Sequence, residues 1–407
     1  MKTKASKKRS YELAWRYESR VATQHLGSRK YSTSSRAIGE LVANALDAHA
    51  TLIDIELVEN ALGGTEKVVI TDNGKGMSPA ELRGRFVVVG VEPTGEGEGT
   101  RLGRLGVGRL AVHRIGNVST WTTTAGQVRS AFTLRTDDGK RLKVNEESVS
   151  AESPGGTTIE IFNVLDTGKD RLTPIRVAND LLSQYCSFLL GHPKRRIRVN
   201  GGELAVEELI ESREREIIPA SEKVPTEATL DHLMLKRPVD QSRFPKQVLF
   251  SAKGRTVTSI QPEEPLPAQY LGIVECPYLD SIVTSNRESV IDMDEGYRVL
   301  KEAALERINE YSKKISAQRK TTFIEQARQE DFYPYREKNK DPIAEVEQAV
   351  YDVALEKMAL SENLTERPLL RNFLHPLNRE ELDVGHRHPL GLQQQIPQVL
   401  VAPPAVN

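Results

Sequence analysis

The sequence predicts an α+β fold with two domains, and three observations lead to this prediction. The chain has 407 residues, too many for one small domain when domains average roughly 150 residues. Segments with the apolar period of a helix and runs with the alternation of a strand occur in both halves. Neither period continues into the last residues. We therefore expect a basic arm or helix at 1–33, domains at 34–168 and 169–295, a helical segment at 296–370 and a disordered tail at 371–407.

Charge, hydropathy and cysteine content narrow the class of protein. Lysine and arginine number 56 against 57 aspartates and glutamates, so no basic surplus favours nucleic acid as the partner. No window approaches the roughly 18 consecutive apolar residues of a membrane-crossing helix, so no membrane association is expected. Cys186 and Cys276 lie far apart in the sequence and make no disulfide framework. We expect a cytoplasmic protein.

The first domain is expected to open with a helix and to continue with strands. Residues 11–17 carry a weaker helical spacing, which predicts a short leading helix or arm. From Ser34, a capping residue, apolar side chains recur on one helix face: Ile38, Leu41, Val42, Ala45 and Leu46. Alternating residues between glycine-containing turns predict the strands: 53–57, 67–71, 118–123, 128–135 and 157–162.

The second domain and the C-terminal part follow the same two periods. They predict a helix at 174–190, strands at 196–200, 247–250 and 270–275, and long charged helices at 297–329 and 342–361. The glycine-studded stretch 74–108 in the first domain has neither period.

Polar side chains share one face of the helix near residue 40. Glu40, Asn44 and Asp47 are spaced so that they lie within roughly 60° of one another, opposite the apolar face. A solvated polar face is the plainer interpretation. The alternative is one site that receives two carboxylates and an amide.

Two glycine-rich segments support the second interpretation. Asp72 stands at the end of a predicted strand, and Gly74 and Gly76 follow it, which allows the backbone to approach a ligand closely. Gly103, Gly106 and Gly108 precede a helix-like run, where backbone amides can bind a phosphate. A simple turn and a flexible loop are the respective alternatives.

Two common nucleotide-binding motifs do not account for these glycines. The sequence contains no G-x-x-x-x-G-K-[ST], which excludes a P-loop. The stretch 106–111 matches G-x-G-x-x-A but lacks a preceding strand and a well-placed acidic residue, so a Rossmann site is disfavoured.

The sequence contains four segments in this order: E-x-x-x-N-A-x-D-A (40–48), D-N-G-x-G-M (72–77), G-x-x-G-x-G (103–108) and G-T-x-I (156–159). This ordered set resembles the GHKL superfamily of gyrase, heat-shock chaperone, histidine kinase and MutL ATPases. The resemblance implies a Bergerat-type ATP-binding α/β sandwich, with a mixed sheet covered by helices, followed by a transducer-like domain. The stretch 284–288, T-S-N-R-E, looks like a middle-domain loop of ninety-kilodalton heat-shock chaperones.

The resemblance also implies roles for individual residues. Glu40 would be the general base, Asn44 would coordinate Mg²⁺, and Asp72 would accept a hydrogen bond from the adenine amino group. Asp47 is open between a supporting and a structural role. Arg287 would contact the terminal phosphate, with Lys253 as the reserve candidate. The remaining implied ATP-binding residues are Gly74, Gly76, Met77 and Thr157 near the base, and Gly103, Gly106 and Gly108 at the phosphates, with 95–100 as part of a lid.

The chain departs from the family pattern in one respect. Several relatives carry a lid lysine in a G-x-S-x-K stretch, and residues 90–94 have none. Arg101 or Arg104 could substitute for it, and hydrolysis is expected to be slow.

The work done by ATP is inferred by elimination. None of the eight histidines is followed by an acidic residue, which disfavours a histidine kinase, and no second catalytic module is recognisable. The expectation is a Mg-ATP-hydrolysing clamp, chaperone-like or MORC-like in layout, that dimerises with ATP. Two alternatives stay open: a non-hydrolysing ATP-binding scaffold, and a DNA-associated clamp that works with a separate effector such as a nuclease. Short basic runs at 7–9 and 194–196 suggest the latter.

Overall fold

The computed structural model divides the chain into two compact units, 1–308 and 309–407, and both predicted domains fall in the first. The residues it describes are 8–17, 31–89, 108–136, 141–165, 170–236, 247–262, 266, 269–283, 290, 294–329, 345–346, 348–350 and 353.

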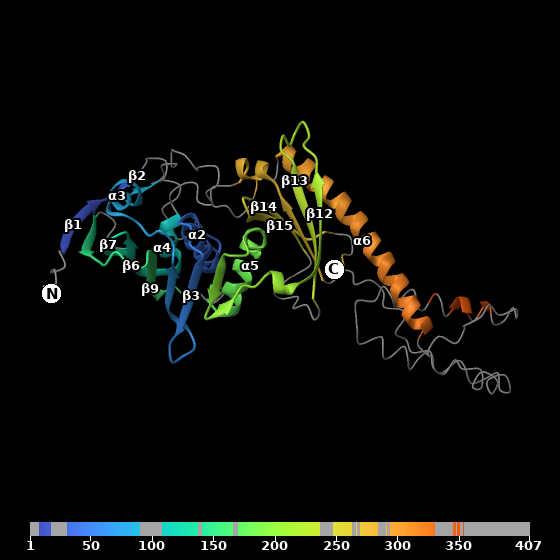
Figure 1. Ribbon diagram of the computed structural model, residues 1–407, viewed down its shortest axis with the longest axis horizontal. Coiled ribbons are helices and arrows are strands. Elements are labelled where there is room, and N and C mark those ends of the chain that lie inside the picture. Colours follow the sequence, from blue (N-terminus) through green and yellow to red (C-terminus); the bar gives the residue numbers. More distant parts are fainter. Residues whose placement is uncertain are drawn as a thin grey trace, which may run out of the picture. The chain divides into compact units, whose positions relative to one another are not determined.

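A nine-stranded mixed sheet organises the first part of the chain (Figure 1). All neighbouring strands are antiparallel except β3 and β10, which run parallel. In spatial order the strands are β1 (Arg9–Ala14), β8 (Arg141–Ser148), β7 (Val128–Arg135), β6 (Gly116–Ala125), β9 (Gly156–Val164), β4 (Thr65–Asp72), β3 (Leu52–Glu59), β10 (Arg196–Val199) and β11 (Gly202–Glu203).

Helices α2 (Ser34–Asp47), α4 (Val112–Ile115) and α5 (Pro174–Gly191) share one hydrophobic core with this sheet. Helix α2 begins where the Thr33 side chain accepts a hydrogen bond from the Arg36 backbone N–H. Its predicted apolar face is buried, as are alternate residues of β3 such as Ile53 and Ile55. The predicted helix near residue 40 and the predicted strands of the first domain are confirmed.

The predicted leading helix is wrong over residues 9–14. This segment is the edge strand β1, which pairs antiparallel with β8, and the short strand β2 (Arg16–Tyr17) pairs parallel with β5 (Val88–Val89). Tyr11 and Leu13 are half-buried and alternate with exposed Glu12 and Ala14, which is the period of a strand. Pairing with β8, a strand that was not predicted, decides the conformation.

A five-stranded sheet forms the second part of the first unit. Strands β14 and β16 are parallel and the other neighbours are antiparallel. The predicted strands at 247–250 and 270–275 are confirmed, whereas β12, β13 and β15 were not predicted. The spatial order is β12 (Ile210–Ile218), β13 (Ala228–Leu235), β16 (Tyr270–Glu275), β14 (Gln247–Ala252) and β15 (Arg255–Ile260).

The long helix α6 (Glu295–Gln329) confirms the helix predicted at 297–329. Its first turns belong to the unit of the second sheet, where the rings of Tyr297 and Phe250 meet with centroids 5.5 Å apart. Of the helix predicted at 342–361, residues 345–346, 348–350 and 353 are helical and the others lie outside the described residues, as does the expected tail. No helix in the described part of the chain is long and apolar enough to cross a membrane.

Helix α5 joins the two sheets, since it contacts α2, β10 and β15. The turn between β14 and β15 packs directly on this helix. Gly254 in that turn has a φ of +78°, and a Cβ added to it would lie 2.8 Å from the Phe188 Cα. Only glycine combines this left-handed conformation with such a close approach.

We expect Gly254→Ala to lower the free energy of unfolding by more than the cost of placing alanine in this left-handed backbone conformation. Gly201→Ala is the matched control, because Gly201 has a φ of +79° but nothing within 4 Å of an added Cβ. Overpacking against Phe188 should make the loss at Gly254 larger by about 1–3 kcal/mol. Urea unfolding of the two variants measures the difference, and equal losses would contradict the packing assigned to this turn.

Candidate functional site

Glu40 lies in the middle of α2 and is buried, with 7% of its surface exposed. Its Oε1 accepts a hydrogen bond from Nη2 of Arg255, the first residue of β15, at 2.6 Å. Burial alone would lower the pKa of the Arg255 guanidinium, but the charge of Glu40 outweighs it and raises that pKa above its ordinary value. The pair is therefore ionic and joins the first domain to the second sheet.

The second oxygen of Glu40 lies beside the end of the predicted phosphate loop. Gly108 starts a short 3-10 helix (Gly108–Ala111), and a Cβ built on it would lie 3.1 Å from Glu40 Oε2 and 3.5 Å from Asn44 Oδ1. The structure thus brings together Glu40, Asn44 and Gly108, three of the predicted site residues. Asn44 is exposed and Asp47, further along the same helix, is half-buried.

Arg109 fixes the start of this short helix. Its guanidinium donates a hydrogen bond to the Val88 carbonyl oxygen and lies over the Phe86 ring, with Cζ 5.4 Å from the ring centroid. Burial lowers the pKa of Arg109 to about 10. Phe86 packs in turn on Trp121 and Phe132, so the residue next to Gly108 is anchored in an aromatic cluster.

Asp72 ends β4 and pairs with Thr157 of β9 in the sheet register. Its Oδ1 accepts a hydrogen bond from the Gly74 N–H at 2.8 Å. Burial raises the pKa of the Asp72 carboxyl, and the N–H groups of Gly74 and Thr157 act in the opposite direction. The Thr157 hydroxyl lies 3.0 Å from that of Thr123, which accepts the Met77 N–H. The predicted site residues Asp72, Gly74, Met77 and Thr157 therefore form one group.

Close backbone approaches surround this group. Gly76 has a φ of +67°, and a Cβ there would lie 2.0 Å from the Thr124 carbonyl oxygen. Gly156 has a φ of +136°, and its Cβ would lie 2.1 Å from the Asp72 carbonyl oxygen. These positions admit no side chain. The close approach found at Gly76 is a contact between main-chain atoms, and the approach of a ligand to Gly76 stays a prediction.

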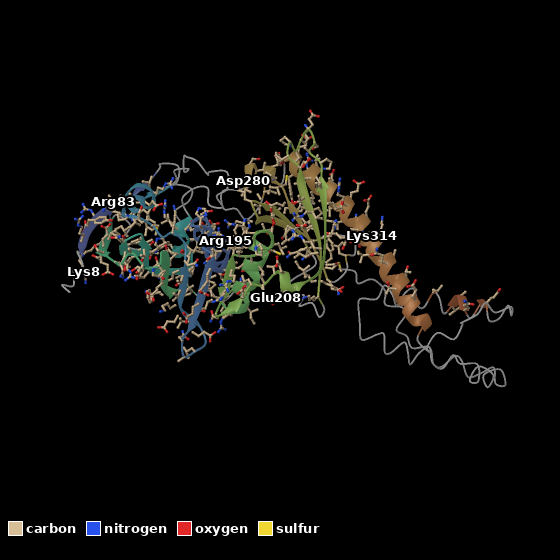
Figure 2. The ribbon with its side chains drawn as sticks, viewed as in Figure 1. Lys8, Arg83, Arg195, Glu208, Asp280 and Lys314 are labelled. Atoms are coloured by element: carbon tan, nitrogen blue, oxygen red, sulfur yellow. The ribbon has the colours of Figure 1, made fainter. Side chains whose placement is uncertain are left out.

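Three predicted site residues lie outside the described residues: Arg287, Gly103 and Gly106, together with the predicted lid segment 95–100. Lys253, the reserve candidate, is described. Its Nζ pairs with Asp280 Oδ2 at 2.7 Å (Asp280 is labelled in Figure 2). Arg255 was not predicted, because a single arginine after a turn carries no sequence signal of burial.

Two residues of the basic run at 194–196 contact other parts of the protein. Arg195 donates a hydrogen bond to the Ala50 carbonyl oxygen, and Arg196 lies 4.0 Å from a carboxylate oxygen of Glu203.

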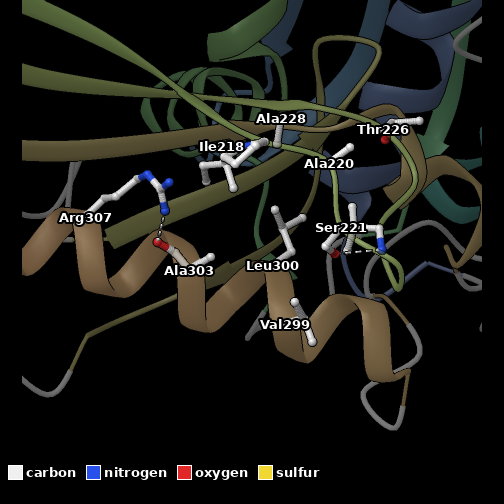
Figure 3. A pocket seen from close by; sticks show the side chains of 11 residues that line it. Ile218, Ala220, Ser221, Thr226, Ala228, Val299, Leu300, Ala303 and Arg307 are labelled. Carbon is white, nitrogen blue, oxygen red and sulfur yellow. Dashed lines mark hydrogen bonds between the residues drawn. The ribbon is translucent and has the colours of Figure 1, made fainter.

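A cavity of about 230 Å³ lies away from these residues, between α6 and the start of β13 (Figure 3). Its walls are mainly apolar, and its one charged lining residue, Arg307, donates a hydrogen bond to the Ala303 carbonyl oxygen at 3.1 Å. We assign no chemistry to this cavity, because its lining residues in the described part of the chain include no carboxylate, histidine or cysteine.

Residues 31–164 match the family model described as "Histidine kinase-, DNA gyrase B-, and HSP90-like ATPase". The DNA mismatch repair protein MutL of Paramagnetospirillum magneticum is 28% identical over 183 residues, covering 44% of this chain and 29% of MutL. The "Putative type II restriction enzyme HgiDII" of Herpetosiphon aurantiacus is 30% identical over 198 residues, covering 44% of this chain and 31% of the relative. The chain therefore spans less than a third of these relatives.

A solved structure described as the N-terminal domain of a DNA repair protein superposes with a TM-score of 0.46 at 13% identity, over 71% of this chain and 97% of the other. This likeness adds nothing to the sequence relationship. The family match covers the segment in which Glu40, Asn44, Asp72 and Gly108 lie. Residues 31–164 therefore match the GHKL ATPase family, and the first domain has the Bergerat-type α+β fold of that family.

Proposed function

We propose that this protein binds Mg-ATP between Asp72 and Gly108 and hydrolyses it to ADP and phosphate. The observation that carries the proposal is the environment of Glu40, a buried carboxylate with one oxygen on Arg255 and the other beside the loop-end Gly108. Phosphoanhydride hydrolysis requires an oriented water and neutralisation of charge rather than a covalent intermediate. A carboxylate fixed beside the glycine that ends the predicted phosphate loop suits the first of these tasks.

The Asp72 group fits the adenine base. A carboxylate that keeps free acceptor positions can take a hydrogen bond from an exocyclic amino group. Thr157 lies opposite Asp72 in the register, and its hydroxyl can complete the network. The main-chain contacts at Gly76 and Gly156 leave a wall without side chains, against which a flat ring can lie.

The Asn44 group fits Mg²⁺ and the phosphates. Mg²⁺ prefers oxygen ligands, takes few of them from protein and keeps several waters and phosphate oxygens. Asn44 is an exposed residue with an amide oxygen, and Gly108 leaves room beside Glu40 Oε2, to which a Cβ at position 108 would come within 3.1 Å. When bound, the ion would neutralise phosphate charge. Glu40 would accept the proton of the attacking water.

We further propose that nucleotide binding is coupled to a change in conformation and to dimerisation, as in a molecular clamp. The support is that Glu40 contacts the second sheet directly, so an event at the phosphates is transmitted to it. Arg287 and the lid segment 95–100 stay part of this proposal. A chaperone-like or MORC-like mode of action is one form of it, and a scaffold that binds ATP without hydrolysis is the alternative.

We expect Glu40→Gln to keep ATP affinity within a few-fold and to lower kcat by about 10²–10⁴, the usual contribution of a general base. Glutamine retains the shape and the acceptor for Arg255 but cannot take a proton. Calorimetry and phosphate release on the same samples measure both quantities. Glu56→Gln, on an exposed position of β3, is the control. A wild type that binds ATP and never turns it over would favour the scaffold.

We expect Asp72→Asn to lower ATP affinity at least about tenfold, because an interaction with a charged acceptor contributes roughly 1.5–3 kcal/mol. The asparagine side chain also carries an NH2 donor, which would face the adenine amino group, another donor. Asp54→Asn, in the neighbouring strand β3, should leave affinity unchanged. Calorimetric titration measures both variants, and wild-type affinity in Asp72→Asn would contradict the placement of the base.

A DNA-associated clamp is the second candidate, favoured by the names of the two relatives. MutL is a DNA mismatch repair protein and HgiDII is described as a restriction enzyme. If this chain acts on DNA, its affinity should fall steeply between 50 and 200 mM salt, because each phosphate contact releases counterions. Fluorescence anisotropy with a labelled duplex, with and without ATP, measures it. Absence of binding at low salt would remove this candidate.

A further inference from the structure

We infer that Arg255 is a positioning residue for Glu40: it holds one carboxylate oxygen so that the other faces the attacking water. The inference rests on the proposed function and extends it, because it makes hydrolysis depend on a side chain of the second sheet. None of the sequence motifs includes Arg255.

The two oxygens of Glu40 have different surroundings. Oε1 lies 2.6 Å from Arg255 Nη2, and the two side chains are only 9% and 5% exposed. Oε2 lies on the side of Gly108 and Asn44, where the phosphates and the water are proposed to bind. A charge-assisted hydrogen bond at this distance is short and directional, so it fixes the rotation of the carboxylate.

Arg255 is itself rigidly held by the turn that precedes it. The Gly254 N–H donates to Glu275 Oε1 at 3.0 Å, and the Ser187 hydroxyl donates to Glu275 Oε2 at 3.0 Å. The turn is thereby tied to α5, where Gly254 also packs on Phe188. Because this turn is constrained, the guanidinium of Arg255 has a fixed place and can fix the position of the Glu40 carboxylate.

Helix α5 supports both partners of the pair. The Arg255 Cζ lies 5.9 Å from the centroid of the Tyr185 ring. The Tyr185 hydroxyl donates a hydrogen bond to the carbonyl oxygen of Gly39, the residue before Glu40. One buried tyrosine therefore contacts the arginine and the backbone that carries the carboxylate.

Stability alone is a weak reason for this pair. A buried ion pair often contributes little net stability, because desolvation of both charges offsets their attraction. Moreover, Arg255 Nε and Nη1 are buried without a hydrogen-bond partner among the described residues. A purely structural arginine is expected to satisfy these groups. Orientation of a reacting group is a reason that does not depend on net stability.

The test compares Arg255→Met and Arg255→Lys in the full chain. Methionine fills much of the volume without charge, and lysine restores a cation. We expect Arg255→Met to lower kcat about tenfold to a hundredfold, as small misplacements of reacting groups do, with ATP Kd changed less than about threefold. Arg255→Lys should recover part of the lost kcat. The matched control is Arg215→Met in β12. It removes an ion-pair partner of Asp231 and should retain wild-type kcat.

Thermal unfolding supplies a measurement that does not need turnover. Removing one partner of a buried pair leaves the other charge unpaired, whereas removing both charges does not. The melting temperature of Glu40→Gln/Arg255→Met should therefore fall less than the sum of the two single shifts. If the shift of the double variant equalled the sum of the two single shifts, the inference would be overturned. This test holds even if Arg255→Met were not stable enough for turnover to be measured.

The kinetic outcomes separate this inference from the proposed function. Wild-type kcat in Arg255→Met would overturn the positioning role and leave the ATPase proposal intact. Failure of a folded Arg255→Lys to exceed Arg255→Met would do the same. Absence of turnover in the wild type under all conditions would overturn the proposed function and this inference together.

Discussion

The ion pair between Glu40 and Arg255 is the constraint on which the arrangement of the first unit depends. A carboxylate and a guanidinium taken out of water must find each other, because either one alone in the interior is very costly. Glu40 comes from a helix of the first domain and Arg255 from a strand of the second sheet, so their pairing requires the two to meet at one place. The ATPase site we propose is thus bounded by both domains rather than by the first alone.

Helix α5 makes this meeting place rigid. It follows the last long strand of the first domain, contacts α2 and β10, and receives the turn before β15. Different side chains of α5 contact the two partners. Tyr185 supports the Glu40 segment, and Phe188 and Ser187 hold the turn that carries Arg255. Close-packed contacts of this kind transmit a displacement instead of absorbing it.

Much of the first domain could be predicted because its segments carry strong local signals. The helix near residue 40 has a clear apolar face, and β4 ends directly at Asp72. Strand β12 escaped prediction because most of its side chains are exposed and polar, so pairing with β13 rather than burial decides its conformation. Arg255 escaped for a related reason: its burial follows from a contact 215 residues away in sequence, which no local pattern encodes.

The glycine contacts around Asp72 also bear on how the proposed base pocket can change over evolutionary time. The contacts of Gly76 with Thr124 and of Gly156 with Asp72 are contacts between main-chain atoms. A wall of this kind cannot be reshaped by exchanging side chains, since any addition would push the strands apart. Adaptation to a different base would therefore require changes in the few side chains of this group, which carry the carboxylate of Asp72 and the hydroxyls of Thr123 and Thr157.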